Sequence, residues 1–304
     1  MVAETVSKGF GLGKPGSKAA LGVVWSVFRA RIKIITRYKG AVLLESIIPI
    51  IFAGLPLLLG SAVAGSEQAA ATNFFSYTGV SCPSTDPAEC ATMFRLYMLM
   101  GSNTFMVVSL MLWLIGYWVR REQETGTLEA LYLSPAKRLY VLAGVTSYTL
   151  VRSLMAFLTA TVLGSLIFRV NPLSGFFGAA ILYLLLGIPA LWGISFFFGA
   201  LVMRIKEANS VIQLLQWVLA FAMGVYFPVT VFPLLLRWTA MAFPPTLMND
   251  AIRSTLLGIT SIYGPWYIVL GLMLTAAWLV PLLGYEFFSW TERRVRRDQG
   301  VGQF

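Results

Sequence analysis

Six long apolar stretches constrain this chain more than any other feature of its sequence. Most of them exceed the roughly 20 residues with which a helix crosses a hydrocarbon core about 30 Å thick. Only 12% of the 304 residues are charged, whereas a soluble domain has about 25%. The sequence therefore predicts an all-α polytopic membrane protein, with six transmembrane helices over residues 42–64, 96–119, 139–168, 176–202, 210–227 and 266–288.

The basic residues predict how these spans are oriented. The net charge is +10, but the bases lie beside apolar spans and not on a soluble domain, so membrane topology explains them better than nucleic-acid binding does. With the N-terminus inside, about 18 of the 23 Lys and Arg residues fall on the cytosolic side, where positive residues accumulate. Both termini are then cytoplasmic, and residues 65–95 form an outer loop.

The outer loop is polar, rich in turn residues, and contains the two cysteines of the chain, Cys82 and Cys90. A disulfide between them is the simplest interpretation on an oxidising side of the membrane, and two free thiols are the alternative. The sequence has no histidine, which excludes histidine-based catalysis and histidine metal sites. We therefore expect neither a catalytic nor a metal site in this chain.

The two ends of the chain are expected in the cytosol, on either side of a transmembrane domain over residues 40–290. Residues 1–17 are predicted to be a flexible N-terminus, and residues 291–304 a basic tail. Residues 18–39 predict a basic amphipathic helix, since Val24 and Val27 recur at helical spacing while Arg29 and Lys33 lie on another side. This pattern is typical of a helix in the membrane surface, although a cytosolic helix packed on a partner is the alternative.

The densest charged segment, residues 120–138, lies between the second and third predicted spans. Within it, Leu128 and Leu131 share one face of a potential two-turn helix that Thr127 can cap. Glu129 lies in the first turn, where the helix dipole favours an acid. A helix this short is not stable alone in water, so we expect it to dock against the membrane helices or a partner.

Residues 228–264 contain four prolines and apolar pieces that are too short to cross a membrane. They predict short helices that enter one leaflet and return, which we call the re-entrant segment. Within this segment Asp250 and Arg253 are spaced for a local pair.

Polar residues inside two predicted spans allow both a packing and a functional interpretation. Arg152 in the third span is expected to snorkel, or to pair with Glu45 or Glu286, in preference to binding a substrate. Gln213 and Gln216 belong to a stripe of polar and small residues on the fifth span. Such a stripe favours packing against another helix over lining a path.

Three motifs connect the chain to a known family. They are E-x-E-x-G-T-L-E-x-L-x-x-S-P over residues 122–135, MGVYFPVTVFP over 223–233 and FPPTLMNDAIRSTLLG over 243–258. Their order, after an amphipathic helix and two spans, resembles the membrane subunit of ABC-2 type exporters, which have the type V ABC fold. The resemblance extends over about residues 20 to 290.

The resemblance implies a role for each of these segments. In that family the loop after the second span contains a coupling helix that inserts into a separate ATPase subunit. In this chain, residues 18–39 correspond to the family's connecting helix. Residues 228–264 correspond to its outer re-entrant helices. The residues thereby assigned to ATPase coupling are Glu122, Glu124, Gly126, Thr127, Leu128, Glu129, Leu131, Ser134 and Pro135. Two copies pair around a path lined by the second and fifth spans, for which the candidate residues are Asn103, Met106, Trp113, Gln213, Gln216, Trp217 and Phe221.

The expected function is that of a permease subunit, not of an enzyme. Aromatic and methionine side chains suit an amphipathic or apolar substrate, such as a drug, an antibiotic, a lipid or a lipid-linked glycan, moved out of the cytosol or the inner leaflet. The chain itself would bind no cofactor. ATP and Mg would be bound by the partner ATPase, of which two copies are expected. This chain would pair with a second copy of itself or with a homologous permease. The complex would lie among the lipids of a prokaryotic cell (inner) membrane. The alternatives are an ion-efflux ABC permease or a membrane-embedded lipid-modifying enzyme, although the sequence lacks the clustered acids or histidines that such an enzyme needs at membrane depth.

Overall fold

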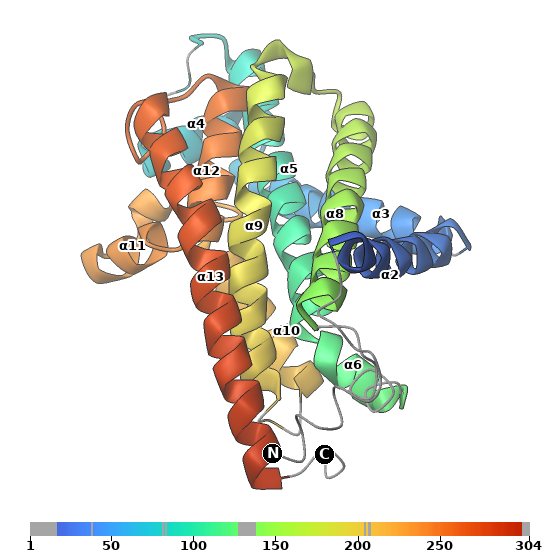
Figure 1. Cartoon of the computed structure of the whole chain (residues 1–304). Helices are drawn as coiled ribbons and strands as arrows, with labels where there is room; N and C mark the ends of the chain where they lie inside the picture. Colours follow the sequence, from blue (N-terminus) through green and yellow to red (C-terminus); the bar gives the residue numbers. More distant parts are fainter. Residues whose placement is uncertain are drawn as a thin grey trace, which may run out of the picture.

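The computed structural model describes residues 17–37, 39–80, 82, 84–126, 138–203, 205 and 208–299. Over these residues every regular element is a helix, and most of the long helices stand roughly upright in the view of Figure 1, whereas α3 (Lys39–Ala64) lies crosswise to them. The helix at their centre is α5 (Pro87–Met111), which packs against α3, α4, α8, α9 and α12 and is buried over almost its whole length. The all-α polytopic class predicted from the sequence is confirmed.

Five helices among the described residues are long and apolar enough to cross a membrane. They correspond to the first, second, third, fourth and sixth predicted spans. Their parent elements are α3 (Lys39–Ala64), α5 with the π-helical turn η1 (Leu112–Gly116), α8 (Arg138–Phe168), α9 (Phe177–Val202) and α13 (Trp266–Gln299). A short 3₁₀ turn, η2 (Pro172–Ser174), joins α8 to α9.

The fifth predicted span is shorter than the sequence suggested. α10 (Ala208–Ala222) has 15 residues, which rise about 22 Å, less than the roughly 30 Å of a hydrocarbon core. The chain turns away just after it at Gly224, whose φ of +62° lies in the left-handed region that glycine adopts at low cost. The described residues therefore contain five candidate spans and one shorter apolar helix in place of six spans.

Residues 65–95, predicted as a polar loop rich in turns, are instead largely helical. α4 (Glu67–Thr78) begins at Ser66, whose hydroxyl accepts a hydrogen bond from the Ala69 amide, and ends at Gly79. α5 then begins at Pro87, well before the predicted start of the second span, with the Asp86 side chain as its N-cap. The capping residues explain this outcome, because the serine, aspartate and glycine that suggested turns each end or begin a helix here.

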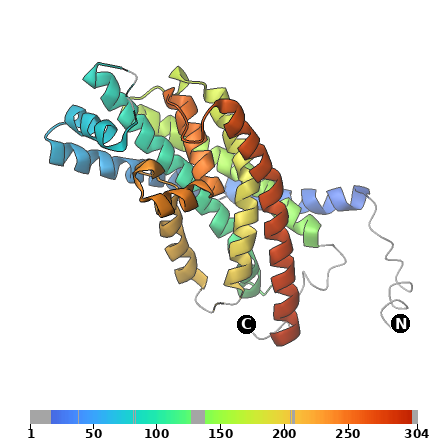
Figure 2. The same cartoon turned by 90° about the vertical axis from the view of Figure 1, so that its left-hand side faces the viewer.

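The N-terminal helix α2 (Ser17–Arg37) lies crosswise to the upright helices and packs against α8 (Figures 1 and 2). The close approach depends on Gly144 of α8, since a Cβ there would lie 2.7 Å from the Val27 Cβ. Other apolar residues of α2 remain exposed, including Leu21 and Trp25. One apolar face thus packs on the protein, and further apolar side chains are left for lipid.

The re-entrant segment consists of the short helices η3 (Val229–Val231), α11 (Leu234–Met241) and α12 (Pro244–Leu257). α12 packs against α5 and α9 and supplies hydrogen-bond donors to the C-terminal end of α10. The Thr246 hydroxyl donates to the carbonyl of Ala222 over 3.2 Å, and the Asn249 amide donates to the carbonyl of Met223 over 3.0 Å. These bonds satisfy carbonyls that the end of a helix leaves without partners.

Arg253 of α12 completes this connection from a buried position. Its guanidinium donates to the carbonyls of Gly224 and Val225 beyond α10, and to the carbonyl of Tyr97 on α5. The same group lies 3.8 Å from the centroid of the Tyr97 ring. Gly101 provides the space, because a Cβ at that position would overlap the guanidinium. One arginine thus joins α5, α12 and the end of α10.

The local pair predicted between Asp250 and Arg253 does not form. Asp250 instead accepts hydrogen bonds from the Ser261 hydroxyl and the Ile262 amide, and so holds the turn that follows α12. The spacing of three residues permitted the pair, but the end of α10 offered Arg253 two carbonyls and α5 a third, and the turn offered Asp250 two donors. Burial raises the pKa of the Asp250 carboxyl to about 6, although these two hydrogen bonds and the charge of Arg253 favour its ionised form.

α9 and α13 make the most extensive helix contact among the described elements and run side by side in Figure 1. Glycines allow their backbones to touch. A Cβ at Gly284 of α13 would overlap the backbone of Gly193, and a Cβ at Gly193 would overlap the backbone of Val280. Small residues are the usual means by which membrane helices approach this closely.

We expect Gly284→Ala to destabilise the protein, because the added methyl group meets backbone atoms that cannot move aside. Overpacking of this kind costs roughly 1–3 kcal/mol. The matched control is Gly271→Ala on the same helix, where a Cβ would meet no atom within 4 Å and alanine favours the helix. Thermal unfolding in detergent should show a lower midpoint for Gly284→Ala alone, and equal midpoints would contradict the packing described.

Asp250 should make stability depend on pH. Because its pKa is raised to about 6 from an ordinary value of 3.8, the folded protein binds this proton more tightly than the unfolded chain does. Stability from this group is therefore greatest below about pH 4 and decreases as pH rises through about 6. Asp250→Asn should remove that component from midpoints measured between pH 4 and 8, whereas Glu89→Gln, at an exposed carboxyl of α5, should leave it in place.

Candidate functional site

A cavity of about 630 Å³ lies where α3, α5, η1, α8 and α10 meet. Its size is within the usual range for small-molecule sites, roughly 300–1,000 Å³. The residues that line it are Glu45, Ile48, Phe52, Phe105, Met106, Ser109, Leu110, Trp113, Leu114, Arg152, Gln213, Gln216 and Trp217. The walls are mainly aromatic and aliphatic, with a few polar groups at defined places.

An ion pair between Glu45 of α3 and Arg152 of α8 forms one polar part of this wall. Arg152 Nε donates to Glu45 Oε2 over 3.2 Å, and Nη2 donates to Glu45 Oε1. The remaining nitrogen, Nη1, donates to the Tyr148 hydroxyl over 2.7 Å. Of the two partners that the sequence allowed for Arg152, the structure selects Glu45, and Glu286 of α13 is exposed elsewhere. Two parallel hydrogen bonds make this the stronger kind of ion pair.

Two glutamines of α10 form the other polar part of the cavity. Gln216 donates to the Ser109 hydroxyl of α5 over 3.0 Å, and Gln213 lies one turn before it along the lining. Beside them the Trp217 ring packs on Phe52 of α3, with centroids 5.8 Å apart. The stripe predicted on the fifth span therefore both packs against α5 and lines the cavity, because Gln216 bonds Ser109 of α5 and belongs to the cavity wall.

The structure brings five of the seven predicted path residues together around this cavity, namely Met106, Trp113, Gln213, Gln216 and Trp217. Asn103 lies elsewhere: it is fully buried, and its amide donates to the Thr161 hydroxyl of α8. Phe221 also lies outside the cavity, where it packs against Phe227 and Phe232.

Sequence reasoning left Glu45 and Arg152 out of the candidate site and treated their pairing as structural. The signal that could have included them is their position, because each is an ionisable residue within a predicted span. What the sequence could not show is that α3 and α8 direct both side chains to the space that α5 and α10 also face.

The cavity is linked to the start of the charged segment, residues 120–138, through η1 and α6 (Trp118–Glu124). Trp113, which lines the cavity, belongs to the π-helical turn, and its carbonyl accepts a hydrogen bond of 2.8 Å from Arg121 of α6. Burial lowers the pKa of Arg121, and the nearby charges of Arg31 and Arg152 lower it further, while Glu122 opposes this effect. Arg121 is therefore a partly buried cation with charges of both signs nearby.

The residues predicted to couple the chain to an ATPase lie partly within the described structure. Glu122 of α6 pairs with Arg31 of α2 over 2.7 Å, which joins this segment to the N-terminal helix. Glu124 is the last residue of α6, and Gly126 has a φ of +69° in the turn after it. Thr127, Leu128, Glu129, Leu131, Ser134 and Pro135 lie outside the described residues.

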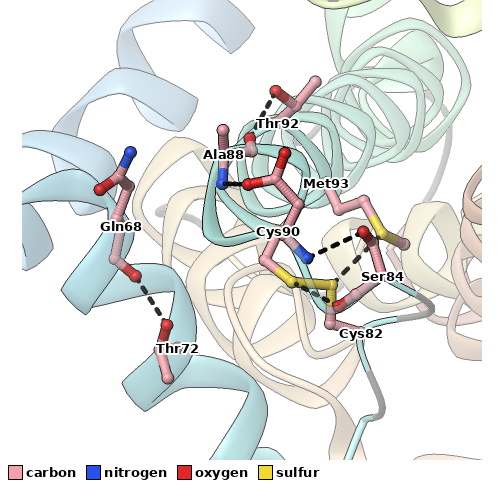
Figure 3. The surroundings of a disulfide bond; sticks show 9 residues. Gln68, Thr72, Cys82, Ser84, Ala88, Cys90, Thr92 and Met93 are labelled. Atoms are coloured by element: carbon pink, nitrogen blue, oxygen red, sulfur yellow. Dashed lines mark hydrogen bonds between the residues drawn. A yellow bond between two sulfur atoms is a disulfide. The ribbon is translucent and has the colours of Figure 1, made fainter.

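Cys82 and Cys90 are joined by a disulfide, with Cα atoms 5.9 Å apart (Figure 3). Cys90 lies in the first turns of α5 and Cys82 in the segment between α4 and α5. The bond therefore fixes that segment to the helix at the centre of the fold. No group of three or more metal-ligating side chains occurs among the residues that the structure describes.

Comparison with known proteins gives one finding. A family model described as "ABC-2 family transporter protein" matches residues 68–283, more than two-thirds of the 304-residue chain. The matched region includes α5, α8 and α10 of the cavity, whereas α2 and α3 lie before it. No curated protein matches the chain. The resemblance drawn from the three motifs is confirmed.

The ion pair should contribute to stability. Arg152→Gln leaves the Glu45 carboxylate without its partner inside the protein, and the expected loss is about 3 kcal/mol or more. The double variant Glu45→Gln, Arg152→Gln removes both charges and should lose less, while Glu286→Gln should behave as the wild type. Thermal unfolding of the four purified proteins measures this, and a double variant as unstable as Arg152→Gln would show that the charges do not act as a pair.

Proposed function

Because the chain belongs to the ABC-2 family of transporter proteins, we propose that it is the permease subunit of an ATP-driven exporter of amphipathic or apolar substrates. The observation that carries this proposal is the cavity between α5 and α10. α5 is the second span, and α10 is the apolar helix that follows the fourth span. Its volume and its largely apolar lining suit a drug, an antibiotic or a lipid. Family membership shows that the chain is a membrane component of a transporter. The direction of transport and the substrate class are part of the proposal.

The path proposed for substrate is supported by the side chains that converge on the cavity. Trp113 and Trp217 provide flat apolar surfaces from two different helices, and Met106 provides a surface that adapts to different shapes. Gln213 and Gln216 offer hydrogen bonds to polar substituents. A site of this kind accepts molecules with an apolar body and a few polar groups.

The proposed energy source is a separate ATPase, docked at residues 120–138. The structure supports a mechanical route from that segment to the cavity, because Arg121 holds the carbonyl of Trp113 and Glu122 holds Arg31. A movement of α6 would therefore displace both a cavity wall and α2. In the complex that we propose, two such chains face each other, each with one ATPase on the cytosolic side.

The double variant Leu128→Asp, Leu131→Asp should abolish docking, since it places two charges on the apolar face expected to enter the ATPase. Copurification of the ATPase subunit and ATP-dependent transport in proteoliposomes should both fall at least tenfold, which corresponds to 1.4 kcal/mol or more. The control is Leu133→Asp, the same substitution on the opposite side of the expected helix. If docking and transport persist in the double variant, the proposed coupling role of this segment is wrong.

A further inference from the structure

Arg152 has hydrogen-bonding capacity that the fold does not use. A guanidinium has five N–H groups arranged in a fixed plane. Glu45 accepts from Nε and Nη2, and the Tyr148 hydroxyl accepts from Nη1. Each terminal nitrogen thus retains one further N–H group that makes no hydrogen bond to the described residues.

These two N–H groups belong to a side chain that lines the cavity. Arg253 also makes three hydrogen bonds, all to backbone carbonyls, but only 3% of that residue is exposed and it does not line the cavity. The Arg152 side chain is 17% exposed. The unused N–H groups of Arg152 therefore belong to a partly exposed side chain beside a space large enough for a ligand, whereas Arg253 is enclosed by the fold.

Two neutral ion pairs lie near this end of the cavity among the described residues, and Arg121 beside them adds a positive charge. Arg31 pairs with Glu122, and Arg152 pairs with Glu45. Burial lowers the pKa of Arg121 most, and the charges of Arg31 and Arg152 lower it further, although Glu122 and Tyr148 oppose this effect. An anion placed here would meet a field of opposite sign, which acts strongly where water is excluded.

We propose that the cavity binds an amphiphile with a terminal oxyanion, a carboxylate or a phosphate, held by the unused N–H groups of Arg152. Two free donors on one guanidinium can bond two oxygens of such a head group, which arginine commonly recognises in this way. The apolar body then lies along Phe52, Trp113 and Trp217. This inference rests on the proposed function, of which it specifies the substrate class.

A cationic amphiphile fits this site less well. Its natural partner would be Glu45, but both oxygens of that carboxylate already accept hydrogen bonds from Arg152. A cation would also add to the positive excess. The cation could still gain roughly 0.5–2 kcal/mol by lying over an aromatic ring of the wall, but it would gain nothing from the ion pair.

The test measures binding to the full-length chain in nanodiscs of neutral phosphatidylcholine at pH 8. The probes are 11-(dansylamino)undecanoic acid and its uncharged amide, detected by energy transfer from tryptophan and corrected with empty nanodiscs. We expect the acid to bind the wild type about tenfold more tightly than the amide does, as a bidentate contact to a charged group allows. Equal affinities would overturn the proposal.

Variants identify the group responsible. Glu45→Gln should keep or increase the preference for the acid, because Arg152 remains. The double variant Glu45→Gln, Arg152→Gln carries no lone charge and should reduce the preference to less than about threefold. Arg293→Gln, at an exposed arginine of α13, should bind as the wild type does. A preference that survives in the double variant, or that is lost in Glu45→Gln, contradicts the assignment to Arg152.

Displacement of the bound acid identifies the source of the oxyanion. Displacement by laurate supports a carboxylate head and displacement by lauroyl lysophosphatidate supports a phosphate head, whereas equally effective displacement by uncharged monolaurin overturns the proposal.

The failure of this inference can be distinguished from the failure of the proposed function. If the acid binds as expected but the complex reconstituted with its ATPase does not transport it, the binding site stands and the export function fails. Transport without any preference for the acid removes only this inference.

Discussion

Backbone carbonyls at the interruptions of membrane helices need donors that lipid cannot supply, and this requirement organises much of the structure. Arginines meet it at three places. Arg253 binds the carbonyls beyond α10, Arg121 binds the carbonyl of Trp113 in the π-helical turn, and Arg95 binds the carbonyl of Phe168 at the end of α8. Each of these side chains comes from another helix or turn, so the bond that satisfies a carbonyl also fixes one element to the next.

The same residue type serves the fold and the cavity in different ways. Arg253 is surrounded by backbone acceptors and by the ring of Tyr97, and it is buried away from the cavity. Arg152 is paired with Glu45, which stabilises its charge inside the protein, and it lines the cavity. Retaining a charge inside the protein costs desolvation energy, and the proposed role of the cavity in binding substrate would give the chain a reason to bear that cost.

The π-helical turn η1 places cavity and coupling segment within a few residues of each other. π-Helical turns occur frequently at functional sites because they leave backbone groups without their regular partners. Here the carbonyl of Trp113 is held by Arg121, and α6, which carries Arg121, leads into the segment expected to contact an ATPase. With Glu122 bound to Arg31 of α2, the elements η1, α6 and α2 form one connected unit beside the cavity.

The sequence by itself determined the class of the protein and most of its spans, because length and apolarity suffice to commit a helix to a membrane. It also determined the family, through motifs whose residues are local. It did not determine that the fifth span would stop at Ala222, that the outer loop would be mostly helical, or that Asp250 and Arg253 would take separate partners. Nor could it place Asn103 away from the cavity and Glu45 and Arg152 beside it. These outcomes depend on the rotation, tilt and depth of each helix relative to its neighbours, and side-chain packing between distant segments fixes those quantities in the tertiary structure.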